Sequence, residues 1–215
     1  MRKTEIGIII IIVLSFAVSF VLWPQMPERM ASHWNFQGQA DGYMPKFWGL
    51  FLMPFISLLL FLFFLLVPKI DPLKENIKKF RKYFDSFILL IFLFLFYIYL
   101  LSLVWNLGAK LNIGRAVAPA LGIVFYYAGV LMEKAKRNWF IGIRTPWTLS
   151  NENVWNKTHR FGGKLFKISG VAAFLGLFLP KQAMWLIIVP IVFSAISIVF
   201  YSFLAFQKED SSKLS

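Results

Sequence analysis

The chain has 215 residues, of which 59% are hydrophobic and 15% are charged, and its formal net charge is +13. Soluble domains carry about 45–50% apolar and about 25% charged residues, so this composition excludes a water-soluble globule and indicates an integral membrane protein. The chain has no cysteine, which excludes disulfides, thiolate metal sites and cysteine nucleophiles.

Six apolar stretches follow one another along the chain, at residues 6–23, 47–67, 84–107, 115–132, 165–180 and 184–206. A helix needs about 17–25 mostly apolar residues to cross the hydrocarbon core. The first stretch has no small-x-small cleavage site, which favours an uncleaved anchor over a signal peptide. The fifth is short, and we expect its helix to begin earlier, with Lys164 and Lys167 reaching the interface. The sequence therefore predicts an all-α polytopic membrane protein with six transmembrane helices.

The cations are divided unequally between the connections. If the N-terminus lies inside, 18 of the 23 Lys and Arg residues lie inside as well. The positive-inside rule then predicts that both termini are cytoplasmic. We therefore interpret the positive net charge as a determinant of membrane orientation, and we do not expect the protein to bind nucleic acid directly. We divide the chain into an N-terminal two-helix region, 1–70, with outer loop 24–46, and a four-helix region, 71–215, with inner loop 133–164.

The outer loop contains His33, Asn35 and Asp41, which could in principle ligate a metal. One imidazole and one carboxylate make a poor zinc site, and calcium requires more oxygen ligands. Asp41-Gly42 favours a tight turn. We therefore interpret the segment as a hydrogen-bonded loop that caps the bundle, and expect no metal and no cofactor.

The connection after the second stretch begins with Asp71-Pro72, a favourable helix start. Apolar residues recur at helical spacing from Leu73 to Phe84, with lysines and arginines around them. This pattern predicts a short amphipathic helix leading into the third span. An interfacial helix lying on anionic headgroups is the favoured interpretation, and a docking surface for an acidic partner is the alternative.

The inner loop carries the run from Asn138 to Leu149, in which Pro146 favours extended geometry at Thr145. Ser150 is the expected N-cap of the next helix. In that helix, Lys157, Arg160, Lys164 and Lys167 form a basic stripe. We expect Gly162-Gly163 to weaken the helix just before the fifth span.

No ionisable residue lies near the middle of any span. Proton-coupled transporters and ion pumps usually place such groups at mid-membrane, so their absence argues against that class. Polar residues within the spans, such as Asn106, Ser169 and Ser194, are interpreted as helix–helix packing groups.

Both polar segments resemble known families. The outer one resembles the N-terminal domain of unknown function of SdpI-like membrane proteins, through Met26-Pro27, His33-Trp34-Asn35, Gly38, Asp41-Gly42-Tyr43 and Lys46. The inner one is similar to the signature of the SdpI immunity family, through 138–149, Trp155, His159-Arg160 and Gly162-Gly163. Six spans in this order also fit that family.

The resemblance implies a non-enzymatic membrane protein that gives immunity to a secreted peptide toxin, the sporulation-delay killing factor. It further implies a receptor that holds a DNA-binding repressor at the membrane. The outer recognition residues would then be His33, Trp34, Asn35, Gly38, Asp41, Gly42, Tyr43 and Lys46. The inner docking residues would be Asn138, Gly142, Arg144, Thr145, Pro146, Trp147, Trp155 and His159. The lipid bilayer is the remaining partner.

Two other classes stay open. In a membrane-embedded enzyme, Arg144 would bind a phosphate and His159 would do acid–base work with Glu152. A channel or transporter is the second alternative. Arg144 could instead brace the loop through carbonyl groups, and Trp147 and Trp155 could anchor it at the headgroups.

Overall fold

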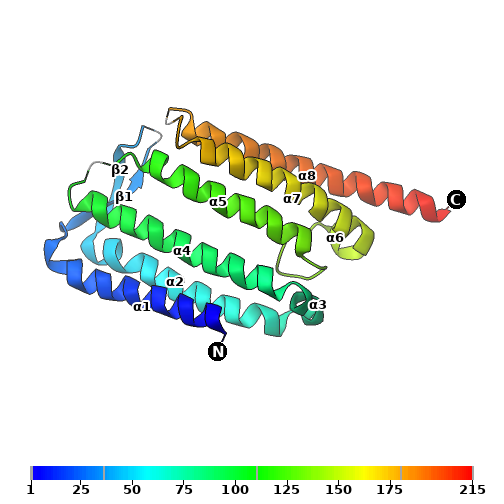
Figure 1. Cartoon of the computed structure of the whole chain (residues 1–215), viewed down its shortest axis with the longest axis horizontal. Coiled ribbons are helices and arrows are strands. Elements are labelled where there is room, and N and C mark those ends of the chain that lie inside the picture. Colours follow the sequence, from blue (N-terminus) through cyan, green and yellow to red (C-terminus); the bar gives the residue numbers. More distant parts are fainter. Residues whose placement is uncertain (1, 36, 110, 180, 215) are drawn as a thin grey trace.

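The computed structural model describes residues 2–35, 37–109, 111–179 and 181–214, so Lys110 and Pro180 lie outside the described residues. Its long helices lie side by side, with a β-hairpin at one end and two short helices at the other (Figure 1). The long helices are α1 (Lys3–Leu22), α2 (Lys46–Ile70), α4 (Arg81–Asn106), α5 (Ile113–Lys134), α7 (Glu152–Leu175) and α8 (Ala183–Leu214). The short elements are η1 (Trp23–Gln25), α3 (Lys74–Lys79), α6 (Pro146–Ser150), β1 (Arg29–Trp34) and β2 (Ala40–Pro45).

The long helices correspond to the predicted apolar stretches. Among the described residues, five of them, α1, α2, α4, α5 and α8, are long and apolar enough to cross a membrane. Helix α7 is as long as these, but it begins at Glu152, and its first half is polar. A sixth crossing by α7 therefore remains a prediction.

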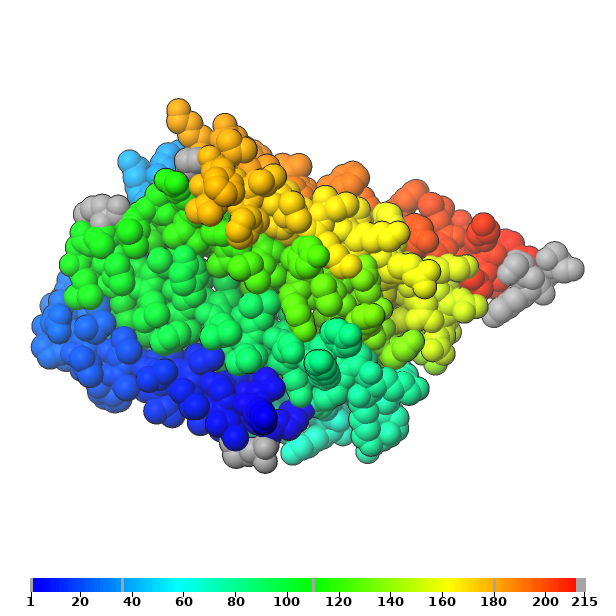
Figure 2. All heavy atoms as spheres, viewed as in Figure 1, coloured from blue at the N-terminus to red at the C-terminus, as the bar shows by residue number. Residues whose placement is uncertain are grey.

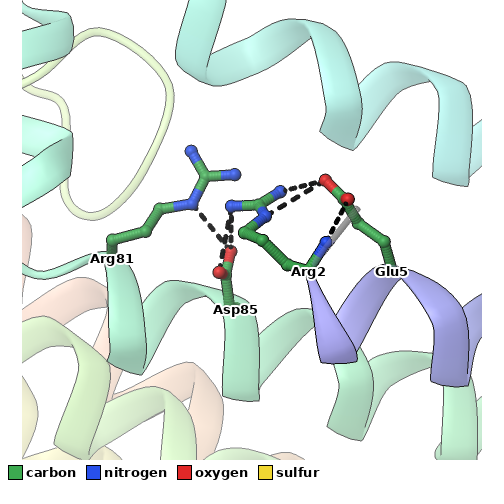
Figure 3. A network of polar contacts seen from close by, with 4 residues as sticks. All are labelled: Arg2, Glu5, Arg81 and Asp85. Atoms are coloured by element: carbon green, nitrogen blue, oxygen red, sulfur yellow. Dashed lines mark hydrogen bonds and ion pairs between the residues drawn. The ribbon is translucent and has the colours of Figure 1, made fainter.

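The helices form two groups. Helices α1, α2 and α4 contact one another and form the first group, and α5, α7 and α8 form the second. The contact between α4 and α5 joins the two groups. At the end of the bundle where α3 lies, a charged network ties α1 to α4 (Figure 3). The Arg2 guanidinium donates to both oxygens of Asp85, at 3.0 and 2.9 Å, and also pairs with Glu5. Arg81 donates to Asp85 at 2.8 Å.

The all-α prediction is wrong over residues 29–45, where β1 and β2 pair as an antiparallel hairpin. Asn106 at the end of α4 attaches this hairpin to the helices. Its side-chain oxygen accepts from the Ala31 N–H at 2.8 Å, and its nitrogen donates to the Ala31 carbonyl at 3.1 Å. Asn106 thus holds the hairpin on the bundle and is not a helix–helix packing group.

The hairpin turn also differs from the prediction. Asp41 and Gly42 lie within β2, and the turn comes earlier, near Gly38, whose φ of +78° favours glycine. Gly42 pairs with His33 across an irregular register, and a Cβ at Gly42 would lie 2.9 Å from the His33 Cβ. A side chain at residue 42 would therefore crowd β1.

Helix α3 is shorter than the predicted amphipathic helix and begins at Lys74 rather than at Asp71-Pro72. Phe80 separates the two helices: α3 ends before it, and α4 starts at Arg81. Ile77 and Phe80 are both buried in the protein core. The apolar face of this segment therefore packs against the bundle and does not lie on headgroups.

Glycines bring α5 and α7 into backbone contact. A Cβ at Gly122 would lie 2.6 Å from the Gly170 carbonyl oxygen, and one at Gly129 would lie 2.5 Å from the Gly163 carbonyl oxygen. Helix α7 continues unbroken through Gly162 and Gly163, so the expected weakening produces no break in the helix. Their small size lets neighbouring elements approach closely, as is common for membrane helices.

Candidate functional site

The candidate site residues lie in two separate places. The outer set lies on or beside the hairpin, and the inner set lies around α6, at the opposite end of the bundle (Figure 1). His33 and His159 therefore cannot share a metal or a proton relay. Within the described ranges, no group of three or more His, Cys, Asp or Glu residues is placed to hold a metal ion.

Short polar contacts stabilise the hairpin itself. His33 Nδ1 lies 2.5 Å from Asp41 Oδ1, and both residues are exposed. The Asn35 side-chain oxygen accepts the backbone N–H groups of Gln37 and Gln39, each at 3.0 Å. These contacts fit the predicted hydrogen-bonded loop.

The strand ends add two further features. The Lys46 ammonium forms an ion pair with Glu28 at 3.2 Å and lies over the Trp23 ring. Its charge is therefore engaged in contacts within the protein. Tyr43 is 50% exposed and points a large apolar surface away from the core. Of these two predicted recognition residues, Tyr43 alone keeps its side chain free for a partner.

An apolar crevice lies between the hairpin and the bundle, and no sequence motif indicates it. It has a volume of about 430 Å³, and Ser32 to Asn35 of the hairpin line one side. Its other lining residues come from α4, the start of α5 and the start of α8, and include Leu101, Val117 and Ile187. We call it the hairpin crevice.

Trp34 contributes an aromatic ring to the hairpin crevice. Its ring packs edge-on against Trp105, with centroids 5.6 Å apart. Its indole Nε1–H is buried and has no acceptor among the described residues. Leaving such a donor unpaired costs about 1–3 kcal/mol.

At the other end of the bundle, the Asn138 side chain holds the loop between α5 and α6 through hydrogen bonds to its backbone. The side chain is fully buried, and its oxygen accepts the backbone N–H groups of Phe140 and Ile141, at 3.0 and 2.6 Å. Its nitrogen donates to the carbonyls of Lys136 and Ile141. Asn138 therefore shapes the loop, and it is not accessible to a partner.

His159 connects the same loop to α7. The Ile143 N–H donates to His159 Nε2 at 2.9 Å, so the ring must carry its proton on Nδ1, which donates to the Trp155 carbonyl at 2.9 Å. Burial lowers the pKa of His159 to about 4, against an opposing effect from the bond to Trp155. His159 lies before the apolar half of α7 and is neutral at physiological pH.

Gly142 and Trp155 complete the surroundings of this imidazole. Gly142 has a φ of +103°, and a Cβ there would lie 2.3 Å from His159 Nε2. The Trp155 ring stacks on His159 with centroids 3.9 Å apart, and its Nε1–H donates to the Ala135 carbonyl at 2.9 Å. Trp155 is fully buried, so the headgroup-anchor interpretation is wrong for this residue.

Helix α6 is set by a capping box. Thr145 caps it, with its backbone N–H donating to Thr148 at 3.0 Å, and Pro146 occupies the first turn. Trp147 packs on Phe203 of α8, with ring centroids 5.2 Å apart. Asn151, rather than the predicted Ser150, caps α7, because its side chain accepts from Asn153 and Val154.

The surface of the loop is formed by Trp139 and Arg144. The Trp139 side chain is 50% exposed, and its carbonyl accepts from the Arg144 guanidinium at 2.8 Å. This contact is the carbonyl bracing considered for Arg144. Asp71, which the sequence placed at a helix start, instead fixes the loop: its carboxylate accepts the Trp139 N–H at 2.9 Å and the Leu73 N–H at 2.6 Å.

The geometry is unfavourable for the enzymatic alternative. Both ring nitrogens of His159 are used inside the protein, and the side chain is 1% exposed. Glu152, its suggested partner, lies exposed in the first turn of α7. A general base must reach a substrate proton, and His159 does not reach the surface.

Two models of known protein families match the chain, one over each of the two polar segments. Residues 134–202, which include α6, α7 and most of α8, match the SdpI/YfhL protein family. This stretch of the chain is similar to the SdpI/YfhL family. Residues 10–58, which include the hairpin, match a domain of unknown function, DUF1648. The resemblance to the SdpI family that the sequence motifs indicated is therefore confirmed.

A curated relative extends the similarity to the whole chain. The "Immunity protein SdpI" of Bacillus subtilis (strain 168) is 29% identical over 214 residues, covering 99% of this chain and 100% of the relative. No solved structure matches the chain. The apolar helices and this similarity make the chain a multi-pass membrane protein.

Proposed function

We propose that this protein protects the cell membrane against a secreted peptide toxin and recognises that toxin at the hairpin end. The similarity to a protein named for immunity supports the general role. The hairpin crevice carries the more specific part of the proposal. Its apolar walls suit a hydrophobic side chain of a peptide.

Survival of toxin-sensitive cells tests this proposal. Cells that express the chain should survive the sporulation-delay peptide toxin at doses that kill cells with an empty vector. Val117→Trp would fill the hairpin crevice and should lower survival at least tenfold. Ile196→Trp, on an exposed face of α8, is the matched control and should protect like the native chain.

Membrane levels of all variants are compared by immunoblot, so that loss of expression is not mistaken for loss of recognition. No gain in survival from the native chain would contradict the immunity role. Full protection by Val117→Trp would contradict the crevice as the recognition site.

For the opposite end, we propose a docking surface for a DNA-binding repressor, centred on Trp139 and Arg144. Both residues are exposed, whereas Asn138, Trp155 and His159 are buried. A partner would therefore contact the loop surface and depend only indirectly on the buried residues. Exposed aromatic and arginine side chains are the residue types that most often carry binding energy at interfaces.

Cross-linking from the native cells tests the docking surface. Tagged native protein, cross-linked in toxin-treated cells, should retain a small DNA-binding protein on purification. Trp139→Ala should abolish that retention, because it removes the exposed ring and leaves the backbone bond to Asp71 in place. Trp185→Ala, at an exposed tryptophan of α8, is the control. Equal retention by Trp139→Ala and the native chain would contradict the proposal.

A further inference from the structure

A basic groove between α7 and α8 plays no part in the proposed function. Its volume is about 440 Å³. Asn156, Lys157, Arg160, Phe161 and Lys164 contribute to it from α7, and Tyr201 contributes from α8. The α7 residues recur at helical spacing, so one face of the helix forms one wall of the groove.

The positive charge of this groove is only partly neutralised. Lys157 pairs with Glu209 of α8 at 2.5 Å, and Asn153 donates to the same carboxylate at 3.3 Å. Arg160 and Lys164 are exposed and make no ion pair in the part of the chain that the structure describes. Two cations of the groove therefore have no ion-paired carboxylate among the described residues.

The groove lies where the exposed surface changes from apolar to charged. Past Lys164, α7 exposes Ile168 and Val171, at 62% and 53%. On α8, Ile196 and Phe200 are 67% and 63% exposed, and charged residues follow Tyr201 within two turns. In a multi-pass membrane protein such apolar faces meet lipid tails, so the groove lies level with the headgroups.

We propose that this groove binds the phosphate headgroup of an anionic phospholipid. The Arg160 guanidinium offers two parallel N–H donors to phosphate oxygens, and Lys164 adds a second cation. The stacked rings of Phe161 and Tyr201, with centroids 4.4 Å apart, lie beside the cations where the acyl chains of a bound lipid begin. The adjacent lipid-facing surface favours a lipid over a soluble acidic segment.

Lipid retention by the full chain tests the proposal. The protein is reconstituted in vesicles of equal phosphatidylcholine and phosphatidylglycerol, extracted in mild detergent, and the co-purified lipids are measured by mass spectrometry. Native protein should be enriched severalfold in phosphatidylglycerol. Arg160→Gln with Lys164→Gln should remove that enrichment while thermal unfolding stays unchanged.

A charge-matched control separates a site from a general charge effect. Lys74→Gln with Lys136→Gln removes two exposed cations elsewhere at the same end and should leave the enrichment intact. Equal loss in both double variants, or no loss in the groove variant, would overturn the proposal. So would displacement of phosphatidylglycerol by soluble polyglutamate or by inorganic phosphate, since either would assign the groove to a soluble anion.

Discussion

His159 is a buried imidazole that must stay neutral, since its Nε2 accepts the Ile143 N–H. Because its folded-state pKa of about 4 lies below the ordinary value of 6.5, the unfolded chain takes up a proton first as the pH falls. The stability that neutral His159 contributes is therefore complete above about pH 6.5 and is lost progressively towards pH 4.

Lowering the pH from about 7.5 to about 5 should cost on the order of 2 kcal/mol of stability through this residue. Thermal unfolding of the detergent-purified protein at the two pH values measures the effect. His159→Gln should unfold at a lower temperature at neutral pH and show a smaller acid-dependent drop. His33→Gln, at the exposed histidine of β1, should keep the full acid-dependent drop of the native chain. An unchanged drop in His159→Gln would contradict the assignment.

At the scale of elements, the contact between α5 and α7 depends on glycine. Gly170→Ala would place a Cβ 2.6 Å from the Gly122 carbonyl oxygen, so the two helices would have to separate. Overpacking of this kind costs about 1–3 kcal/mol.

Unfolding of Gly170→Ala in detergent should show that loss. Gly7→Ala in α1 is the matched control, because its Cβ would meet nothing closer than a side-chain carbon at 3.6 Å. Alanine is the better helix former there, so Gly7→Ala should be neutral or stabilising by up to about 1 kcal/mol. Equal stability of the two variants would contradict close backbone packing.

The hairpin is an element that depends on one distant side chain. Asn106→Leu removes both hydrogen bonds to Ala31 and should cost about 1–3 kcal/mol locally, because the Ala31 backbone groups lose their partner. Hydrogen exchange of the amides in residues 29–45 should accelerate severalfold. Asn76→Leu, which removes a bond to Arg137 at the other end, should leave hairpin exchange unchanged. Exchange that is unaffected by Asn106→Leu would show that the hairpin is held by other contacts.

At the scale of the whole molecule, the orientation and the crossing of α7 remain predictions. The chain has no cysteine, so single cysteines report accessibility without background. We expect an impermeant maleimide to label Gln37→Cys in intact cells and Lys136→Cys only after permeabilisation. The reverse pattern would invert the orientation predicted from charge.

Lys181→Cys, between α7 and α8, decides whether α7 crosses the membrane. If it does, this site should be labelled in intact cells like Gln37→Cys, on the side away from α6. Labelling only after permeabilisation would leave five crossings. The division of the chain into 1–70 and 71–215 also stays a prediction, since α4 packs with both helix groups.

Local properties of the sequence determined the helices and the membrane class. A helix satisfies its backbone hydrogen bonds internally, and the length of an apolar stretch is visible without knowing the fold. The long helices were therefore predicted to within a few residues, except at α7 and at the end of α8, which continues to Leu214. The motifs around His33 and His159 were likewise sufficient to indicate the SdpI family.

The tertiary structure alone decided which motif residues are accessible and where cavities lie. Ala31 pairs with Asn106, Ile143 with His159, and Gly122 lies against Gly170. Each contact joins residues far apart in the chain, and no local periodicity encodes such a partner. The attachment of the hairpin to the bundle, the buried imidazole, the hairpin crevice and the basic groove exist only because packing brings separate segments together.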